Sequence, residues 1–396
     1  MKTNTFIYGN VNFLGKSAAA KRMIYYAKAI ADEENKVFLA SCCYTKIRQE
    51  NFNEIEPGIY VLESKEETHS LYGSLLFLNR LHSFSKRKTS TSRFILYPQS
   101  YFFLELFSVC YMILLKRNRV FYELNEVKKH FLFLYKLNPS SKIKAFYKPV
   151  IGKILFIIMD NLMRYYAGLI CISTNIQAYG EQYNKNTIRI PILTNPRIQT
   201  KITDKIYSEA SHFNIGFSGS IIPGKENLLE FIAVLNKVSD TGYNLKFNLC
   251  GTISEKDFKI IIDSSNKENT VKYYGNLDAN ELSNFLKQQD LLVIPRGYTL
   301  QNKYGFSTKL SDYLNHQKLI LITDVSDNTL YIKDGINGFV VEPNDSRDMY
   351  EKLIYIIENY NILEKKIIEN AILTSKKSFD FRLYKSALQS FLKLEN

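Results

Sequence analysis

The sequence contains no tryptophan and only five histidines in 396 residues. The histidines show no spacing typical of metal ligands, so we expect no metal site and no metal cofactor. The chain also lacks any CxxC pair, which argues against a metal or disulfide framework. Its cysteines stand mostly in apolar runs and are Cys42, Cys43, Cys110, Cys171 and Cys250. This odd count favours reduced, buried thiols in a cytoplasmic protein.

Long hydrophobic runs are missing as well. The most apolar one, Tyr101–Leu115, contains Glu105 and would span about 22 Å as a helix, against about 30 Å of hydrocarbon in a bilayer. We therefore expect a core helix there. Met1–Gly9 lacks the apolar core of a signal peptide.

The chain carries a surplus of positive charge. The formal net charge is +13, which indicates an anionic partner such as a nucleotide, a nucleic acid or an acidic membrane surface. The segment Lys142–Tyr166 mixes cations with aromatic and aliphatic residues, as a helix lying on an anionic bilayer does. The alternative is a core helix with lysines on its solvent side. Since no basic-aromatic recognition motif is visible, we expect no nucleic-acid partner.

The chain is long enough for two domains, and its 45% hydrophobic content can fill two cores. It opens with a strand at Thr5–Tyr8, a helix at Ser17–Glu33 and a strand at Lys36–Ser41, which indicates the α/β class. The loop GNVNFLGKS resembles a P-loop, but five residues separate Gly9 from Gly15 where that motif has four.

The stretch Asp290–Thr323, DLLVIPRGYTLQNKYGFSTKLSDYLNHQKLILIT, has the pattern of a strand, a polar loop, a helix and a strand. We expect the helix to open at Gly305, with Lys309 one turn into it and Asp312 on the same side. Ligands of parallel sheets bind beyond the carboxyl ends of the strands, where a helix N-terminus attracts anions. A cation beside a carboxylate suited to sugar hydroxyls indicates a ligand with phosphate and polyol parts, which describes a nucleotide-sugar.

Several segments carry a family resemblance. They are, in order, FNIGFSGSIIPGKENLLEFI, YNLKFNLCG, VKYYGNLDANELSNFLKQQDLLVIPR, FSTKLSDYL and DGINGFVVEPND. They are similar to consecutive motifs of GT-B glycosyltransferases of the family 4, or group 1, type, and FSTKLSDYL resembles the donor-site helix P-[ST]-K-[LIF]-x-E-Y-L. The match covers Phe213 to Asn359, whereas the N-terminal half agrees only in general shape.

The resemblance implies an α/β protein of the GT-B fold, with two Rossmann-like α/β/α domains facing across a cleft. A C-terminal helix would cross back to the N-terminal domain. We place the acceptor-binding domain at residues 1–200 together with 379–396, and the nucleotide-sugar-binding domain at 201–378.

The resemblance also implies roles for single residues. Lys225, at the start of an expected helix Glu226–Val238, and Lys309 would stabilise the diphosphate, and Glu126 would bind or deprotonate the acceptor hydroxyl. Glu126 could instead cap the next helix, Lys225 could be an ordinary first-turn lysine, and the Gly15–Lys16 loop could be a plain turn. The donor-binding candidates are Gly15, Gly219, Ser220, Arg296, Tyr304, Gly305, Phe306, Ser307, Thr308 and Asp312.

Two positions depart from the family pattern. Ser220 stands where the family has a phosphate-binding arginine, so binding would depend on the two lysines, backbone amides and Arg296. Tyr304, eight residues before Asp312, stands near the place of the first of two family carboxylates. Asp312 fits the second, which contacts the ribose. These departures keep open a catalytically impaired module that binds nucleotide or a partner protein.

The sequence therefore predicts a glycosyltransferase that moves a sugar from a nucleoside-diphosphate donor to a saccharide acceptor, with retained anomeric configuration. By family analogy the acceptor is lipid-linked and the pathway builds bacterial surface polysaccharide such as capsule, O-antigen or exopolysaccharide. We expect a cytoplasmic enzyme with peripheral contact on the inner face of the membrane. A sugar-nucleotide epimerase is the alternative within the same fold.

Overall fold

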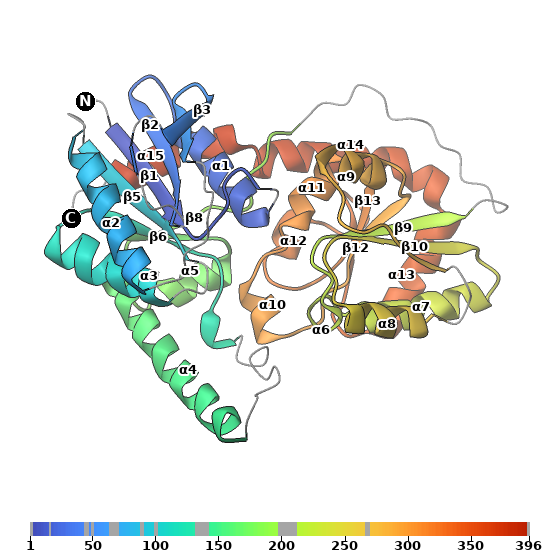
Figure 1. The fold of residues 1–396 in the computed structure, drawn as a ribbon. Coiled ribbons are helices and arrows are strands. Elements are labelled where there is room, and N and C mark those ends of the chain that lie inside the picture. Colours follow the sequence, from blue (N-terminus) through green and yellow to red (C-terminus); the bar gives the residue numbers. More distant parts are fainter. Residues whose placement is uncertain are drawn as a thin grey trace. The chain divides into compact units, whose positions relative to one another are not determined.

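The structure is a computed structural model, and it describes residues 3–15, 17–42, 47–48, 51–62, 71–87, 91–98, 102–130, 142–196, 212–265 and 270–393. The chain divides into two compact units (Figure 1). Unit 1 comprises Met1–Leu193 and Phe381–Asn396, and unit 2 comprises Thr194–Asp380.

Unit 1 is built on a sheet whose described strands run in the order β3-β4-β2-β1-β5-β6-β7-β8. All neighbours pair in parallel except β3 and β4, which are antiparallel at one edge. The strands are β1 (Thr3–Gly9), β2 (Asn35–Ser41), β3 (Phe52–Glu56), β4 (Ile59–Leu62), β5 (Thr91–Tyr97), β6 (Val120–Leu124), β7 (Gly168–Cys171) and β8 (Thr187–Arg189).

The alternation of side chains along the central strands gives this sheet two different faces. On one face Phe6 pairs in register with Phe38 and Phe94, and its ring stacks on theirs at centroid distances of 5.1 and 5.3 Å. On the other face Ile7 pairs with Leu39 and Ile95, and these aliphatic residues belong to a core cluster with residues of α1 and α15. Both faces are therefore buried, as in other sheets of parallel strands.

The helical segments of unit 1 are α1 (Ala18–Ile30), α2 (Leu71–Lys86), α3 (Phe102–Phe107), a π-helix at Ser108–Leu115, α4 (Lys142–Leu162), a 3₁₀ turn at Met163–Tyr165, α5 (Thr174–Gly180), a 3₁₀ turn at Phe381–Tyr384 and α15 (Lys385–Lys393). Ser173 caps α5 by accepting a hydrogen bond from the Ile176 amide. None of the described helices is long and apolar enough to span a bilayer.

The end of the chain returns to unit 1, as the resemblance implies. Leu388, Phe391 and Leu392 of α15 are buried in the core cluster that contains α1. The Gln389 amide also donates hydrogen bonds to the Ile30 carbonyl and to Asp32. Together these contacts make α15 part of the unit 1 core.

Unit 2 contains a fully parallel sheet in the order β11-β10-β9-β12-β13-β14. Its strands are β9 (Phe213–Ser218), β10 (Leu245–Cys250), β11 (Val271–Tyr273), β12 (Leu291–Ile294), β13 (Leu319–Thr323) and β14 (Phe339–Val341). Its helices are α6 (Pro223–Glu226), α7 (Leu228–Asp240), α8 (Glu255–Asp263), α9 (Ala279–Lys287), α10 (Leu300–Tyr304), α11 (Lys309–Asn315), α12 (Asn328–Tyr331), α13 (Ser346–Glu358) and α14 (Tyr360–Ser378). Figure 1 shows α7 and α8 on one side of this sheet and α9 and α14 on the other.

Two expectations about unit 1 need correction. The run Tyr101–Leu115 is helical within its described part, but it changes from α-helix to π-helix at Ser108, and its last two leucines are more than half exposed. It is therefore only partly a core helix. Among the cysteines, Cys42, Cys171 and Cys250 are free and buried as expected, whereas Cys110 is free and exposed, and Cys43 lies outside the described residues.

Candidate functional site

The carboxyl ends of β9 and β12 form the centre of the candidate site. These strands are parallel neighbours, so the segments that leave them emerge at the same edge of the sheet. Gly219 and Ser220 follow β9, and Arg296 follows β12. Lys225 lies in α6, the first helical turn after β9, and Lys309 begins α11. The topology thus brings together three cations that are far apart in the sequence.

A buried carboxylate connects two of these cations. Glu226 Oε1 accepts hydrogen bonds from Lys309 Nζ at 3.0 Å and Arg296 Nη2 at 3.0 Å, and Oε2 accepts one from Arg296 Nε at 3.1 Å. The side chains of Glu226, Arg296 and Lys309 are 2%, 8% and 10% exposed. Burial alone would raise the pKa of Glu226, but the two cations hold this pKa well below its usual range.

The Lys309 side chain has little room to move. Its ammonium lies 4.8 Å from the centroid of the Phe217 ring, at a distance typical of a cation–π contact. A Cβ at Gly219 would come within 2.8 Å of Lys309 Cε, and Gly219 has a φ of 122°, a conformation that favours glycine. Burial lowers the pKa of Lys309 to about 8, with Glu226 acting in the opposite direction and Arg296 and Lys225 adding to the decrease.

The connection from β12 to α11 differs from the expectation. The predicted polar loop contains a short helix, α10, which Thr299 caps by accepting a hydrogen bond from the Asn302 amide. Gly305 ends α10 instead of opening the next helix, and α11 begins only at Lys309. The amides of residues 305–307 therefore do not form a helix N-terminus, and Lys309 is the first residue of its helix.

The remaining donor-binding candidates of this connection have different surroundings. Phe306 is buried against Tyr331 and Phe379, with ring centroids 5.5 and 6.3 Å away, so it belongs to an aromatic cluster. Tyr304, Gly305, Thr308 and Asp312 are half-buried. Ser307 is 1% exposed, and its hydroxyl oxygen has no hydrogen-bond partner in the described structure.

The expected helix Glu226–Val238 is also interrupted. Lys225 and Glu226 lie in α6, Asn227 adopts a left-handed conformation with a φ of 53°, and α7 starts at Leu228. Lys225 is half-buried, and Ser220 is exposed. Asn227 thus separates α6 from α7, so Lys225 does not open the long helix.

The candidates of unit 1 lie in two loops. Glu126 follows β6 directly and is exposed. Its neighbour Asn125 donates a hydrogen bond to the Tyr97 hydroxyl at 2.8 Å. Burial raises the pKa of Tyr97, and the charges of Glu123 and Glu126 raise it further.

Gly15 closes a turn in which its amide donates to the Asn12 carbonyl at 3.0 Å. A Cβ at this position would lie 2.9 Å from that carbonyl oxygen. Lys16 lies outside the described residues.

Two residues that hold the unit 2 site together, Glu226 and Asn302, are not among the candidates from the sequence. Glu226 was expected only as the first residue of a helix, and no local pattern shows that it meets residues 70 and 83 positions later. Asn302 is 1% exposed and donates to the carbonyl oxygens of Lys225 and Gly297 at 2.8 and 2.9 Å. It thereby ties α6 to the connection after β12, and nothing in the segment TLQNKY indicates this role.

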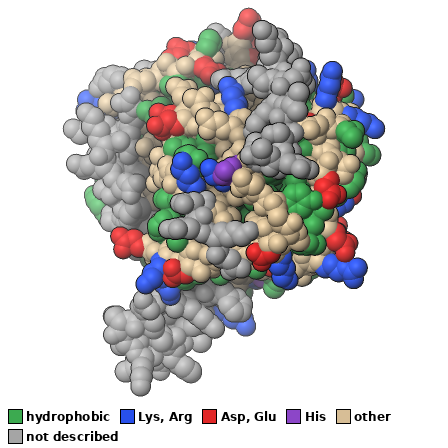
Figure 2. Space-filling model, turned by 90° about the vertical axis from the view of Figure 1, so that its right-hand side faces the viewer, with side chains coloured by type: hydrophobic (Ala, Val, Ile, Leu, Met, Phe, Trp, Pro, Cys, Tyr) green, Lys and Arg blue, Asp and Glu red, His purple; other side chains and the backbone are tan. Residues whose placement is uncertain are grey.

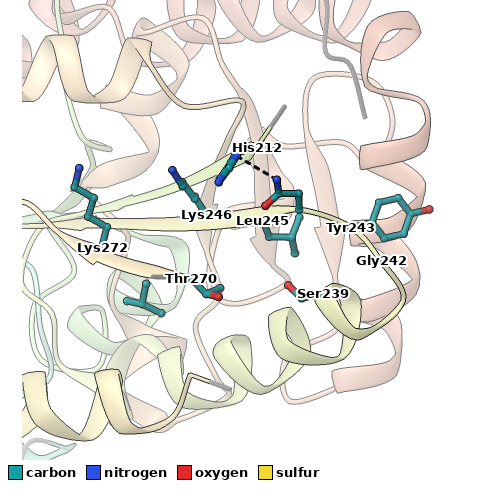
Figure 3. A pocket seen from close by; sticks show the side chains of 10 residues that line it. His212, Ser239, Gly242, Tyr243, Leu245, Lys246, Thr270 and Lys272 are labelled. Atoms are coloured by element: carbon teal, nitrogen blue, oxygen red, sulfur yellow. Dashed lines mark hydrogen bonds between the residues drawn. The ribbon is translucent and has the colours of Figure 1, made fainter. Parts of the chain in front are cut away.

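A separate hollow of about 780 Å³ lies at the opposite edge of the unit 2 sheet (Figure 3). Its lining includes His212, Lys246 and Lys272, at or near the amino ends of β9, β10 and β11. Figure 2 shows basic and acidic side chains mixed over the described part of one face of the molecule. None of the candidate site residues lines this hollow.

Residues 199–374 match the family model described as glycosyl transferases group 1. This part of the chain is therefore similar to group 1 glycosyltransferases. A curated relative, an uncharacterized glycosyltransferase of Methanocaldococcus jannaschii, is 23% identical over 210 residues, which are 53% of this chain and 54% of that protein. The match thus spans about half the length of the relative.

Solved structures agree over the whole chain. Sucrose-phosphate synthase from Thermosynechococcus elongatus is 10% identical with a TM-score of 0.68, and the alignment covers 98% of both chains. HepE of Anabaena, solved in complex with UDP-glucose, is 14% identical with a TM-score of 0.68, covering 98% of this chain and 99% of the other. These similarities confirm the predicted GT-B fold, and the residues that match the family model, 199–374, lie within unit 2.

Proposed function

We propose that this protein is a glycosyltransferase that transfers a sugar from a nucleoside-diphosphate donor to a hydroxyl group of a saccharide acceptor. The observation that carries the proposal is Lys309, a buried ammonium at the carboxyl ends of β9 and β12 within the part of the chain that is similar to group 1 glycosyltransferases. A buried cation costs free energy, and Glu226 supplies one negative charge against the two cations that it bonds, which favours an anionic ligand here.

The charge balance of the site suits a diphosphate. Lys225, Arg296 and Lys309 supply three positive charges and Glu226 supplies one negative charge, which leaves a surplus of two. In glycosyl transfer, negative charge grows on the leaving diphosphate while the sugar becomes oxocarbenium-like. Lys309 and Lys225 stabilise that charge in the proposed mechanism, and no divalent metal is needed.

The role proposed for Arg296 differs from direct phosphate binding, which the sequence suggested. Its Nε and Nη2 are both engaged by Glu226, so it acts through the position of that carboxylate more than as a free phosphate donor. Asp312, half-buried in the first turn of α11, is proposed to hold the ribose. Glu126, exposed directly after β6, is proposed to act on the acceptor hydroxyl.

The acceptor is proposed to be lipid-linked and the pathway to be the assembly of surface polysaccharide. Supporting this, the described part of α4 presents Ile154 and Ile157, both more than half exposed, and Tyr165 follows on the next turn at 47% exposure. Lys153 and Arg164 are exposed nearby in the sequence. An apolar stripe flanked by cations suits the surface of an anionic bilayer. The side chains of residues 142–151 lie outside the described part.

The test begins with the donor. UDP- and GDP-sugars are screened for thermal stabilisation of the protein, since a ligand that binds only the folded state raises the midpoint. The stabilising donor is then incubated with a bacterial membrane fraction, with and without EDTA. We expect sugar transfer that survives EDTA and is lost in Lys309→Ala.

Other outcomes point to the alternatives. Donor binding without transfer or donor turnover would favour a catalytically impaired module. Ser220, which is exposed, and Tyr304 suggest this alternative, because they stand where the family has an arginine and a carboxylate. A changed sugar nucleotide without acceptor would indicate an epimerase. Unchanged donor affinity and transfer in Lys309→Ala would contradict the proposal itself.

A further inference from the structure

Glu226 lies between two cations from separate segments and bonds both of them. It is 2% exposed, and its two oxygens receive three hydrogen bonds, two from Arg296 and one from Lys309. The contact with Arg296 is bidentate, so each carboxylate oxygen of Glu226 accepts one hydrogen bond from the guanidinium. Arg296 and Glu226 therefore form a neutral, rigid pair, and the charge of Lys309 remains in surplus.

Lys309 needs a fixed hydrogen-bond partner because a lysine side chain is flexible. A lysine ammonium ends a flexible four-carbon stem with three N–H donors. Here the stem is confined between Gly219 and the Phe217 ring, and Glu226 takes one of the three donors. The end of the side chain is thus held from three sides, by residues of β9, by the turn after it and by α6.

We propose that Glu226 is a positioning residue of the donor site, which fixes the Lys309 ammonium where the diphosphate binds and keeps it protonated. This inference rests on the proposed function for the identity of the ligand. Both oxygens of the Glu226 carboxylate are bonded to Arg296 and Lys309, so the proposal gives Glu226 no direct contact with the donor. It acts through Lys309, with Arg296 holding the carboxylate in place.

The charges around Lys309 determine what happens without this carboxylate. Glu226 and Lys225 face it from α6 and Arg296 from the segment after β12, and Asp312 is on its own helix. Burial, Arg296 and Lys225 all lower the pKa of Lys309, and Glu226 raises it. Removing Glu226 therefore moves this pKa below 8, so that part of the ammonium is lost near neutral pH.

The experiment uses a charge-matched variant. Glu226→Gln alone leaves two buried cations without a counter-ion, which destabilises the fold. The double variant Glu226→Gln/Arg296→Met removes one charge of each sign and keeps the surplus at the site. Glu230→Gln is the control, because Glu230 lies one turn later and bonds Ser346 and Asn227 without contacting Lys309.

Two measurements are made on the full chain. The first is the affinity for UDP by calorimetry at pH 7, and the second is the pH dependence of Lys309 labelling by an amine reagent, read by mass spectrometry. For the double variant we expect UDP affinity to fall about tenfold or more. The labelling midpoint should move below that of the unmodified protein, because Glu226 raises the Lys309 pKa by both its charge and its hydrogen bond, and this loss outweighs the loss of the Arg296 charge, which lowers it. The control should match the unmodified protein in both.

Unchanged UDP affinity and an unchanged labelling midpoint in the double variant would overturn the inference, because net charge alone would then suffice. If the unmodified protein binds no nucleoside diphosphate, the proposed function fails instead. The labelling midpoint still decides the role of Glu226 in that case, since it needs no ligand.

Discussion

Gly219 and Lys309 lie in direct contact across the site, with room for no further atom between them. A methyl group at residue 219 would come within 2.8 Å of Lys309 Cε, although the two residues are on different segments. The turn after β9 therefore determines where the ammonium of α11 can be.

Gly219→Ala should displace Lys309 and weaken donor binding. The added Cβ pushes the lysine stem away from Phe217 and Glu226, and the φ of 122° adds backbone strain of about 1–3 kcal/mol. We expect UDP affinity to fall at least about tenfold by calorimetry. Gly242→Ala is the control, since its φ is 105° but no atom lies within 4 Å of the new Cβ. Equal losses of UDP affinity in both variants would contradict the steric explanation.

Donor affinity should decrease as the pH rises through about 8. The pKa of Lys309 is lowered to about 8, so its ammonium is present below this pH and lost above it, whereas a terminal phosphate is already ionised above about pH 6. Calorimetric titration with UDP between pH 6.5 and 9.5 checks this. Lys225→Ala removes a charge that lowers the Lys309 pKa, so the decrease should shift to higher pH. A flat profile for the unmodified protein would refute the assignment.

Glu123→Ala should strongly destabilise unit 1. Glu123 is fully buried, bonds Arg22 at 2.6 Å and accepts a hydrogen bond from Tyr26. Its loss leaves a buried guanidinium without a counter-ion, at a cost of about 3–5 kcal/mol. Thermal unfolding followed by circular dichroism should show a lower midpoint. Glu351→Ala, which breaks the exposed pair with Arg347, should leave the midpoint unchanged.

The exposed face of α4 should bind anionic vesicles. The variant Ile154→Glu/Ile157→Glu places two carboxylates on that face, which an anionic surface repels. We expect the unmodified protein to float with phosphatidylglycerol vesicles in a density gradient and the variant to remain in solution. Ile362→Glu, on the highly exposed Ile362 of α14, is the matched control. Flotation of all three proteins would exclude α4 as the membrane-binding element.

The fold could be predicted from local signals where strands are apolar and helices are capped. The strands β1 and β2 contain the predicted Thr5–Tyr8 and Lys36–Ser41, and the helix predicted from Ser17 is capped by that residue. The edge strand β3, FNEIE, was missed because it is mostly polar and pairs on one side only. The helix α10 was missed because five residues are too short to show a period.

Of the charged residues that the structure places at the carboxyl ends of β9 and β12, the sequence indicates the cations but not the carboxylate of Glu226. Lys225 and Lys309 were visible because they stand in motifs next to strand ends. The role of Glu226 cannot be predicted locally, because its partners Arg296 and Lys309 follow 70 and 83 residues later and such pairings depend on the strand order. Arg296 was expected to face a phosphate, and its bond to Glu226 came only from the folded chain.

The return of α15 to unit 1 has a consequence for synthesis on the ribosome. Unit 2 is continuous in the chain, from Thr194 to Asp380, and all of its residues are synthesised before α15. Unit 1 must wait, because Leu388, Phe391 and Leu392 complete its interior. Unit 1 therefore starts first and is completed last, and a chain truncated after residue 380 would contain all of unit 2 but lack the α15 side chains that complete the interior of unit 1.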